Sequence, residues 1–106
     1  MKPSQFTYEK PNNLAELFGL LAEHGANATI LAGGQSLMAT MNMRLSAPEI
    51  LVDINGLAGL SKISVSSGML RIGALTRQTD VAESKEVEAH APLINLAMPH
   101  VAHAAI

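Results

Sequence analysis

The sequence predicts an α+β fold of two small lobes, a parallel lobe followed by the start of an antiparallel one. Three observations predict it: the first half alternates apolar strands with helical patterns, the second half opens with a hairpin pattern, and the chain has only 106 residues. Strands that alternate with helices are typical of parallel βαβ units, whereas closely spaced alternating strands indicate antiparallel pairing. We place the first lobe at residues 1–56 and the second, incomplete lobe at residues 57–106.

The first lobe is expected to open with a strand and a helix. Residues 6–9 form the strand, and Pro11 ends it. Asn13 provides an N-cap, and Glu16 three residues later completes a capping box. Gly25 is placed to end the helix in the left-handed conformation. Apolar residues at helical spacing predict one buried face, made of Leu14, Leu17, Phe18 and Leu21.

Two further strands and a second helix complete the first lobe. Residues 29–31 and 50–54 are short apolar runs of the kind found in strands that are covered on both faces. Pro48 stops the helix between them. This order predicts a parallel βαβαβ lobe with right-handed crossovers. The second helix is expected to bury one face, made of Leu37, Met38, Met41 and Leu45.

The second lobe begins with a hairpin and continues with helices. Residues 63–65 and 70–72 alternate apolar and polar side chains, and the Ser-Ser-Gly sequence at 66–68 supplies the turn between them. Thr76 is expected to N-cap a short helix, and Pro92 to open another. These elements predict an antiparallel sheet with helices beside it.

Composition excludes several classes of protein. The chain is 48% hydrophobic and 15% charged, which fits an ordinary globular protein rather than a disordered one. A net charge of −2, with scattered Lys and Arg, indicates no nucleic-acid partner. Without Cys the chain has no disulfide, thiolate metal site or thiol nucleophile. No apolar run is long enough for a membrane span and no signal peptide opens the chain, so we expect a cytoplasmic protein.

The clearest chemical signal lies in residues 31–37. A buried strand enters Gly33 and Gly34, and a helix capped by Ser36 follows. Glycines permit positive φ angles and let a ligand approach the backbone, and the free N–H groups of a helix start attract anions. A phosphate or pyrophosphate is the natural occupant, with donors added by Ser36 and Gln35. The segment is neither a GxGxxG motif nor a P-loop, so a tight turn that binds nothing is the local alternative.

Several segments, in order, resemble one family. Residues 32–37 (Ala-Gly-Gly-Gln-Ser-Leu), followed by residues 43–45 and 48–54, are similar to the first flavin signature of the FAD-binding medium subunits of molybdenum hydroxylases. This group includes the medium subunit of carbon monoxide dehydrogenase and the FAD domain of xanthine dehydrogenase. Residues 72–76 (Ile-Gly-Ala-Leu-Thr) resemble a second flavin-bordering element of the family, and the opening residues 6–11 also match. The resemblance is colinear over essentially the whole chain.

The resemblance implies a FAD-binding fold of the vanillyl-alcohol-oxidase and cell-wall-reductase type. It also implies partners: a molybdopterin-containing large subunit that oxidises substrate, and a small subunit whose 2Fe–2S clusters pass electrons to FAD and on to an external acceptor. No residue of this chain would be a catalytic acid or base. The residues expected to hold the pyrophosphate are Ala32, Gly33, Gly34, Gln35 and Ser36, with Leu37 beside them. Those expected to border the cofactor from the second lobe are Gly73, Ala74, Leu75 and Thr76.

The given sequence stops where the family has another FAD contact. In the family, the segment similar to residues 103–106 is followed by a second glycine-rich loop of the type Arg-Asn-Arg-Gly-Thr-x-Gly-Gly. We therefore expect a truncated family member that binds FAD weakly or not at all by itself. The alternative is a cofactor-free α+β module, or vestigial fragment, without redox activity. An Arg-Gly-Thr-x-Gly-Gly loop downstream of Ile106 would favour the flavoprotein.

Three other patterns have plainer explanations. His100 and His103 form an HxxH pair, but without a nearby Cys and with a proline disturbing the helix we expect no metal site there. Ser36 lacks the G-x-S-x-G elbow of a hydrolase nucleophile. Met38 and Met41 fit the core stripe of the second helix, so packing explains them better than metal binding.

Overall fold

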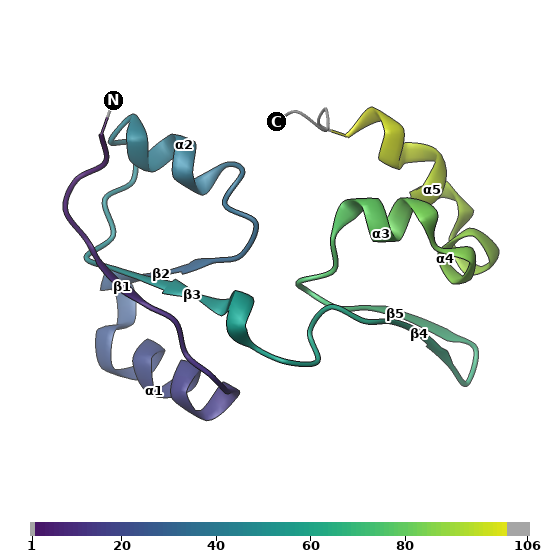
Figure 1. Cartoon of the computed structure of the whole chain (residues 1–106), viewed down its shortest axis with the longest axis horizontal. Helices are drawn as coiled ribbons and strands as arrows, with labels where there is room; N and C mark the ends of the chain where they lie inside the picture. Colours follow the sequence, from purple (N-terminus) through teal and green to yellow (C-terminus); the bar gives the residue numbers. More distant parts are fainter. Residues whose placement is uncertain (1, 102–106) are drawn as a thin grey trace. The chain divides into compact units, whose positions relative to one another are not determined.

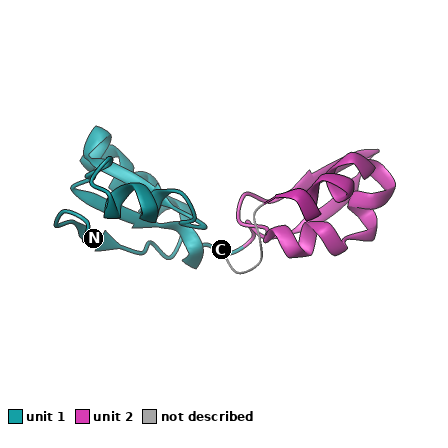
Figure 2. Ribbon diagram, turned by 90° about the horizontal axis from the view of Figure 1, so that it is seen from above, with its two compact units in different colours: residues 1–58 teal, residues 59–106 magenta. Residues whose placement is uncertain are grey.

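The computed structural model describes residues 2–101 of the chain. The chain divides into two compact units, Met1–Ala58 and Gly59–Ile106, which Figure 2 distinguishes by colour. Unit 1 contains a parallel sheet with two helices, and unit 2 contains an antiparallel hairpin with three helices. The predicted α+β fold with a parallel lobe and the start of an antiparallel lobe is therefore confirmed.

The sheet of unit 1 has three parallel strands: β1 (Thr7–Glu9), β2 (Ala28–Leu31) and β3 (Ile50–Asp53). Their order is β1-β3-β2, and every residue of β3 is buried. The first connection therefore passes over β3 and the second turns back, which requires helices on opposite faces if both crossovers are right-handed. Figure 1 shows α1 and α2 on opposite sides of the strands. The register pairs Leu31 with Asp53, so the carboxyl ends of β2 and β3 meet at one edge.

Helix α1 (Leu14–His24) begins with the predicted capping box. The Asn13 side-chain oxygen accepts the Glu16 N–H at 2.8 Å. The Glu16 carboxylate accepts the N–H of Asn12 at 2.8 Å, one residue further out than in the usual box. At the other end Gly25 has φ +51° and ψ −125°. Its φ is positive as predicted, but its ψ lies outside the left-handed helical region.

The predicted apolar face of α1 is only partly buried. Leu17 is 7% exposed, whereas Leu14 is 48% and Phe18 is 60% exposed. Helical spacing determines which side chains share a side of a helix, but what covers that side depends on the tertiary structure. In the described residues the small sheet covers only part of it. The expectation was wrong for Leu14 and Phe18.

Helix α2 (Leu37–Asn42) is shorter than predicted. Within α2, Met41 is almost fully buried, at 1% exposed, as expected. The chain leaves the helix before Arg44, which has φ +58°, and Leu45 is 73% exposed. The assignment of Leu45 to the buried face was wrong because the helix ends before it.

Unit 2 opens with the predicted hairpin. Strands β4 (Ile63–Ser66) and β5 (Met69–Ile72) pair antiparallel, with Ile63 opposite Ile72. The two turn residues have positive φ angles, +52° at Ser67 and +74° at Gly68. Two consecutive positive φ angles are the hallmark of the type I′ turn, whose twist matches that of the strands.

Three helices follow the hairpin: α3 (Gln78–Glu83), α4 (Lys85–His90) and α5 (Pro92–Ala97). Pro92 occupies the first turn of α5, as predicted. Thr76 is not a helix cap, because α3 begins one residue later, with Arg77 at the N-cap position and no side-chain cap bond. The core of this unit contains Leu75, Val81 and Val87, all buried.

Candidate functional site

The turn between β2 and α2 holds the two adjacent glycines of the predicted site (Figure 1). Gly34 has φ +78°, a conformation that L-residues rarely adopt. A Cβ at Gly34 would lie 3.2 Å from Leu31 Cδ1 and 3.3 Å from Met38 Cγ. A Cβ at Gly33 would have no neighbour within 4 Å. Packing therefore explains a glycine at position 34 but not at position 33. At position 33 the lack of a Cβ leaves the backbone open to solvent.

Backbone N–H groups are available along this turn. The first bond of α2 runs from the Met38 N–H to the Gly34 carbonyl, at 3.1 Å, and the next from Thr40 to Ser36, at 3.0 Å. Within residues 2–101, no backbone acceptor faces the N–H groups of residues 33–37. Such orphan donors at a helix start suit an anion. Because α2 has only six residues, its dipole is weak, and hydrogen bonds from these N–H groups would contribute more to anion binding than the dipole would.

Ser36 holds the N-cap position but makes no cap bond. Its φ and ψ of −94° and −40° are helical, and its side chain accepts no hydrogen bond from the helix. An N-cap side chain normally receives a backbone N–H from an extended conformation, which Ser36 does not have. The predicted Ser36 cap bond was therefore wrong. The side chains of Ser36 and Gln35 are exposed at the turn.

A buried carboxylate lies next to this turn, and the sequence reasoning missed its role. Asp53, at the end of β3, is 7% exposed. It accepts hydrogen bonds from the Tyr8 hydroxyl, from the Asn55 N–H at 2.9 Å and from Asn55 Nδ2 at 2.7 Å. Asn55 Nδ2 also donates to the Ala32 carbonyl at 2.7 Å. We call Asp53 and Asn55 the brace, because they join the end of β3 to the first residue of the glycine turn.

The charge of the brace follows from its contacts. Burial raises the pKa of Asp53, but hydrogen bonds from Tyr8 and Asn55 and the charge of Lys10 outweigh burial and hold that pKa below its ordinary value. Asp53 is therefore ionised at neutral pH. The hydrogen bond to Asp53, with smaller contributions from burial and from the carboxylate charge, raises the pKa of Tyr8 above its ordinary value. The sequence signal was a pair of polar residues, Asp53 and Asn55, at the end of a buried strand.

The second predicted segment, residues 73–76, lies in unit 2 after β5. A Cβ at Gly73 would be 2.2 Å from the Leu60 carbonyl oxygen, a distance that no packing tolerates. The Gly73 N–H donates to the Lys62 carbonyl at 2.9 Å, and the Leu75 N–H to Leu60 at 2.7 Å. Gly73 is thus required by the path of its own backbone. Ala74 is exposed at the turn, whereas Thr76 Oγ1 is buried without a hydrogen-bond partner.

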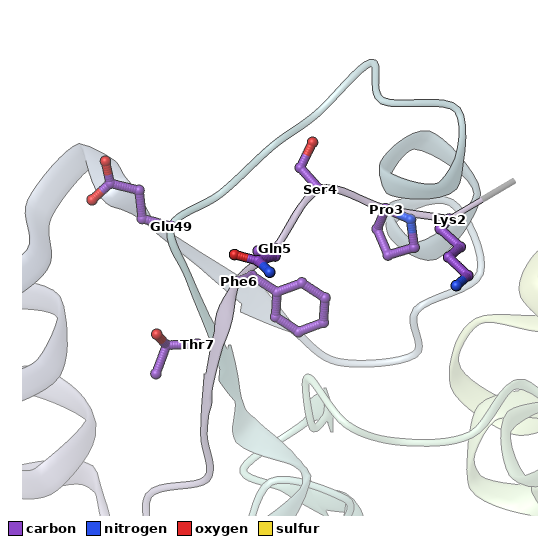
Figure 3. Close-up of a pocket in the computed structure, with 7 residues that line it drawn as sticks. All are labelled: Lys2, Pro3, Ser4, Gln5, Phe6, Thr7 and Glu49. Carbon is purple, nitrogen blue, oxygen red and sulfur yellow. The ribbon is translucent and has the colours of Figure 1, made fainter.

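A shallow hollow lies at the other edge of the unit 1 sheet. Figure 3 shows its lining, which comes from the segment leading into β1 and from Glu49, just before β3. It therefore lies at the amino ends of these strands, whereas ligands of open α/β sheets bind at the carboxyl ends. None of the predicted site residues lines it. The lining residues are Lys2, Pro3, Ser4, Gln5, Phe6, Thr7 and Glu49.

Metal and membrane features are absent from the described part of the chain. Across residues 2–101, no three His, Cys, Asp or Glu side chains gather into a metal site. His100 is exposed, and its HxxH partner His103 lies outside the described residues. Over the same range, no helix has the length and apolar character that a membrane crossing needs.

Comparisons with known proteins identify relatives for nearly the whole chain. The family described as FAD binding domain in molybdopterin dehydrogenase matches residues 4–106. The caffeine dehydrogenase subunit beta of Pseudomonas sp. strain CBB1 is 39% identical over 103 residues, covering 97% of this chain and 35% of the relative. The carbon monoxide dehydrogenase structure from Hydrogenophaga pseudoflava matches with a TM-score of 0.95 and 36% identity, covering 99% of this chain and 37% of that one. Quinoline 2-oxidoreductase from Pseudomonas putida 86 matches with a TM-score of 0.92, 36% identity and coverages of 99% and 36%.

The chain spans about a third of the length of the relatives it matches. The glycine turn fits the pyrophosphate of the cofactor in this family's description: it offers unpaired N–H donors and an open approach at Gly33. Residues 73–76 offer less to a ligand, since packing accounts for Gly73 and the Thr76 hydroxyl, although partnerless, is buried.

Proposed function

The chain belongs to the family of FAD-binding domains of molybdopterin dehydrogenases, and we propose that its glycine turn binds the pyrophosphate of FAD. The observation that carries the proposal is the set of backbone N–H groups at residues 33–37 that have no acceptor in the described part of the chain. A pyrophosphate needs several donors at short range and tolerates no Cβ between them. The open position at Gly33 meets that second condition.

Each residue of the turn has a definite part in this proposal. The N–H groups of Gly33, Gly34, Gln35 and Ser36 donate to the phosphate oxygens, and the exposed Ser36 hydroxyl and Gln35 amide add further donors. Ala32 and Leu37 flank them, the first before the glycines and the second at the start of α2. For residues 73–76 the proposal rests on the family resemblance, which implies that Gly73, Ala74, Leu75 and Thr76 border the cofactor.

We further propose that the protein is the FAD-binding medium subunit of a molybdenum-hydroxylase-type complex. Bound FAD supplies an isoalloxazine ring that takes up and passes on electrons. The residues of this chain bind and orient the cofactor, and none acts as an acid or base. The relatives' names support an assembly of several subunits, since they include a subunit beta and a carbon monoxide dehydrogenase medium chain. The partners are a molybdopterin-containing large subunit and a small subunit with 2Fe–2S clusters. These 106 residues contain no Cys to ligate a cluster.

Equilibrium dialysis with three ligands tests the binding proposal. The chain is dialysed against FAD, ADP and riboflavin, and bound ligand is measured by absorbance. If the turn holds the pyrophosphate, FAD and ADP bind with similar dissociation constants and compete, whereas riboflavin, which has no phosphate, binds far more weakly. Equal binding of riboflavin, or no binding of FAD and ADP at millimolar concentration, would contradict the proposal. The second result is also what a cofactor-free module predicts.

A further inference from the structure

We propose that Asn55, held by the buried Asp53, is the positioning residue of the glycine turn and sets its affinity for phosphate groups. The inference rests on the proposed function of that turn. Asn55 follows β3, and its Nδ2 donates both to Asp53 Oδ1 and to the Ala32 carbonyl, each at 2.7 Å. One side chain thereby ties the exit of β2 to the exit of β3.

The bond to Ala32 has two effects on the turn. It fixes the carbonyl one residue before Gly33, and therefore the direction in which the chain enters the glycines. It also engages the Ala32 carbonyl oxygen, whose partial negative charge would repel a phosphate if that oxygen turned toward the site. Glycine at positions 33 and 34 gives the turn great conformational freedom, so an external constraint is needed to hold its N–H groups in one arrangement.

Asp53 holds both the backbone N–H and the side-chain amide of Asn55. The carboxylate accepts the backbone N–H of Asn55 at 2.9 Å and the side-chain amide at 2.7 Å, through the same oxygen. Its other oxygen accepts the Tyr8 hydroxyl from β1. Because Asp53 is 7% exposed and its bonds to Asn55 are part-buried, they constrain the amide more than a fully exposed contact would. The brace therefore connects the middle of β1 and the ends of β2 and β3 to the turn.

The test replaces Asn55 and follows the turn with and without ligand. Asn55→Ala removes the side-chain bonds to Asp53 and Ala32, and Asn55→Ser retains a hydroxyl but is too short to reach Ala32. Asn27→Ala is the matched control, because Asn27 precedes β2 at the opposite edge of the sheet and its side chain is exposed. Tyr8→Phe removes the Asp53 contact with β1 and leaves the Asn55 bonds intact.

Without ligand, we expect the amide resonances of residues 33–37 to shift and broaden in both Asn55 variants, while those of β1 and β3 keep their positions. This measurement uses no ligand, so it tests the role of Asn55 even if the turn binds no phosphate. With ADP as the probe, we expect the dissociation constant to rise roughly five- to tenfold in the Asn55 variants, as for loss of one buried hydrogen bond, and to stay within about twofold in Asn27→Ala and Tyr8→Phe.

Unchanged turn resonances in a folded Asn55→Ser chain would overturn the inference. Equal loss of ADP affinity in Tyr8→Phe and Asn55→Ala would also overturn it, since the effect would then be general weakening of the sheet. Failure of the wild-type chain to bind ADP would instead contradict the proposed function, and the ligand-free resonances would still decide the role of Asn55.

Discussion

The two glycine segments of this chain, residues 33–34 and residue 73, were both predicted to border the cofactor, but they differ in the reason for their glycine. At residues 33–34 the turn is open: a Cβ at Gly33 would meet nothing within 4 Å, and the N–H groups around it have no acceptor in the described residues. At Gly73 a Cβ would be 2.2 Å from the Leu60 carbonyl oxygen, and the N–H already donates to Lys62. The first segment has room and donors for a ligand, whereas the second is occupied by its own chain.

Two separate properties therefore decide why a glycine lies beside a predicted cofactor site. One is whether its backbone or neighbours forbid a Cβ, and the other is whether its N–H is already used. Within residues 2–101, no neighbour opposes a Cβ at Gly33 and its N–H has no backbone acceptor. At Gly34 the positive φ and close neighbours oppose a Cβ, but the N–H has no backbone acceptor in the described part of the chain. At Gly73 the Leu60 backbone excludes a Cβ and the N–H is already bonded. Substitutions at the three glycines should therefore separate stability from ligand binding.

The largest effect is expected at Gly73. Gly73→Ala places a methyl group against the Leu60 backbone, which cannot move aside as a side chain would, so unit 2 should lose about 3 kcal/mol or more of stability. Hydrogen exchange of the β4 and β5 amides measures the loss. Tyrosine fluorescence follows unit 1 alone, because Tyr8 is the single tyrosine of the chain. A loss below about 1 kcal/mol would show that the Leu60 contact relaxes easily.

A smaller effect is expected at Gly34. Gly34→Ala forces an L-residue to φ +78° and brings its Cβ to 3.2 Å from Leu31 Cδ1, which should cost about 1–2 kcal/mol of stability in unit 1. Urea unfolding followed by Tyr8 fluorescence gives the value, with Gly19→Ala in helix α1 as a control that meets no steric contact. Equal stability of the two variants would mean that the turn adopts another conformation.

Acid should weaken unit 1 more than unit 2. The folded pKa of Asp53 lies below its ordinary value, so its contribution to stability is present above about pH 4 and is lost as the pH falls through the folded pKa. In unit 2 the pKa of Glu86 is also lowered, chiefly by its own backbone N–H and by Ser84, but this side chain is exposed and contributes little. Hydrogen exchange between pH 6 and pH 3 compares the units. Asp53→Asn should flatten the dependence in unit 1, and an unchanged slope would exclude Asp53 as its source.

The smallest effect on stability is expected at Gly33. Gly33→Ala adds a methyl group that meets nothing, so the free energy of unfolding should change by less than about 0.5 kcal/mol. ADP binding should nevertheless weaken clearly, because the methyl group occupies the approach to the N–H groups. Urea unfolding measures the change in stability of this variant, and dialysis measures its affinity for ADP. Unchanged affinity would contradict a ligand role for this turn.

Local patterns in the sequence predicted most of the elements but not their long-range contacts. Apolar runs predicted β2 and β3, residues 6–9 predicted β1, and the Ser-Gly pair predicted the hairpin turn, because each pattern depends on neighbouring residues. The exposure of Phe18 depends on how much of α1 the sheet covers, which no helical pattern contains. The same holds for the site: the glycine turn was visible as a motif, whereas the bond between Tyr8 and Asp53 joins residues 45 positions apart.

The most direct test of the contrast between the two glycine segments is an NMR titration of the isotopically labelled chain with inorganic pyrophosphate. If the contrast holds, we expect saturating shifts of the amide resonances of residues 33–37, with the Gly73 amide unmoved because its N–H remains bonded to Lys62. Shifts at Gly73 without shifts at residues 33–37, or the same small shifts spread over the whole surface, would contradict it.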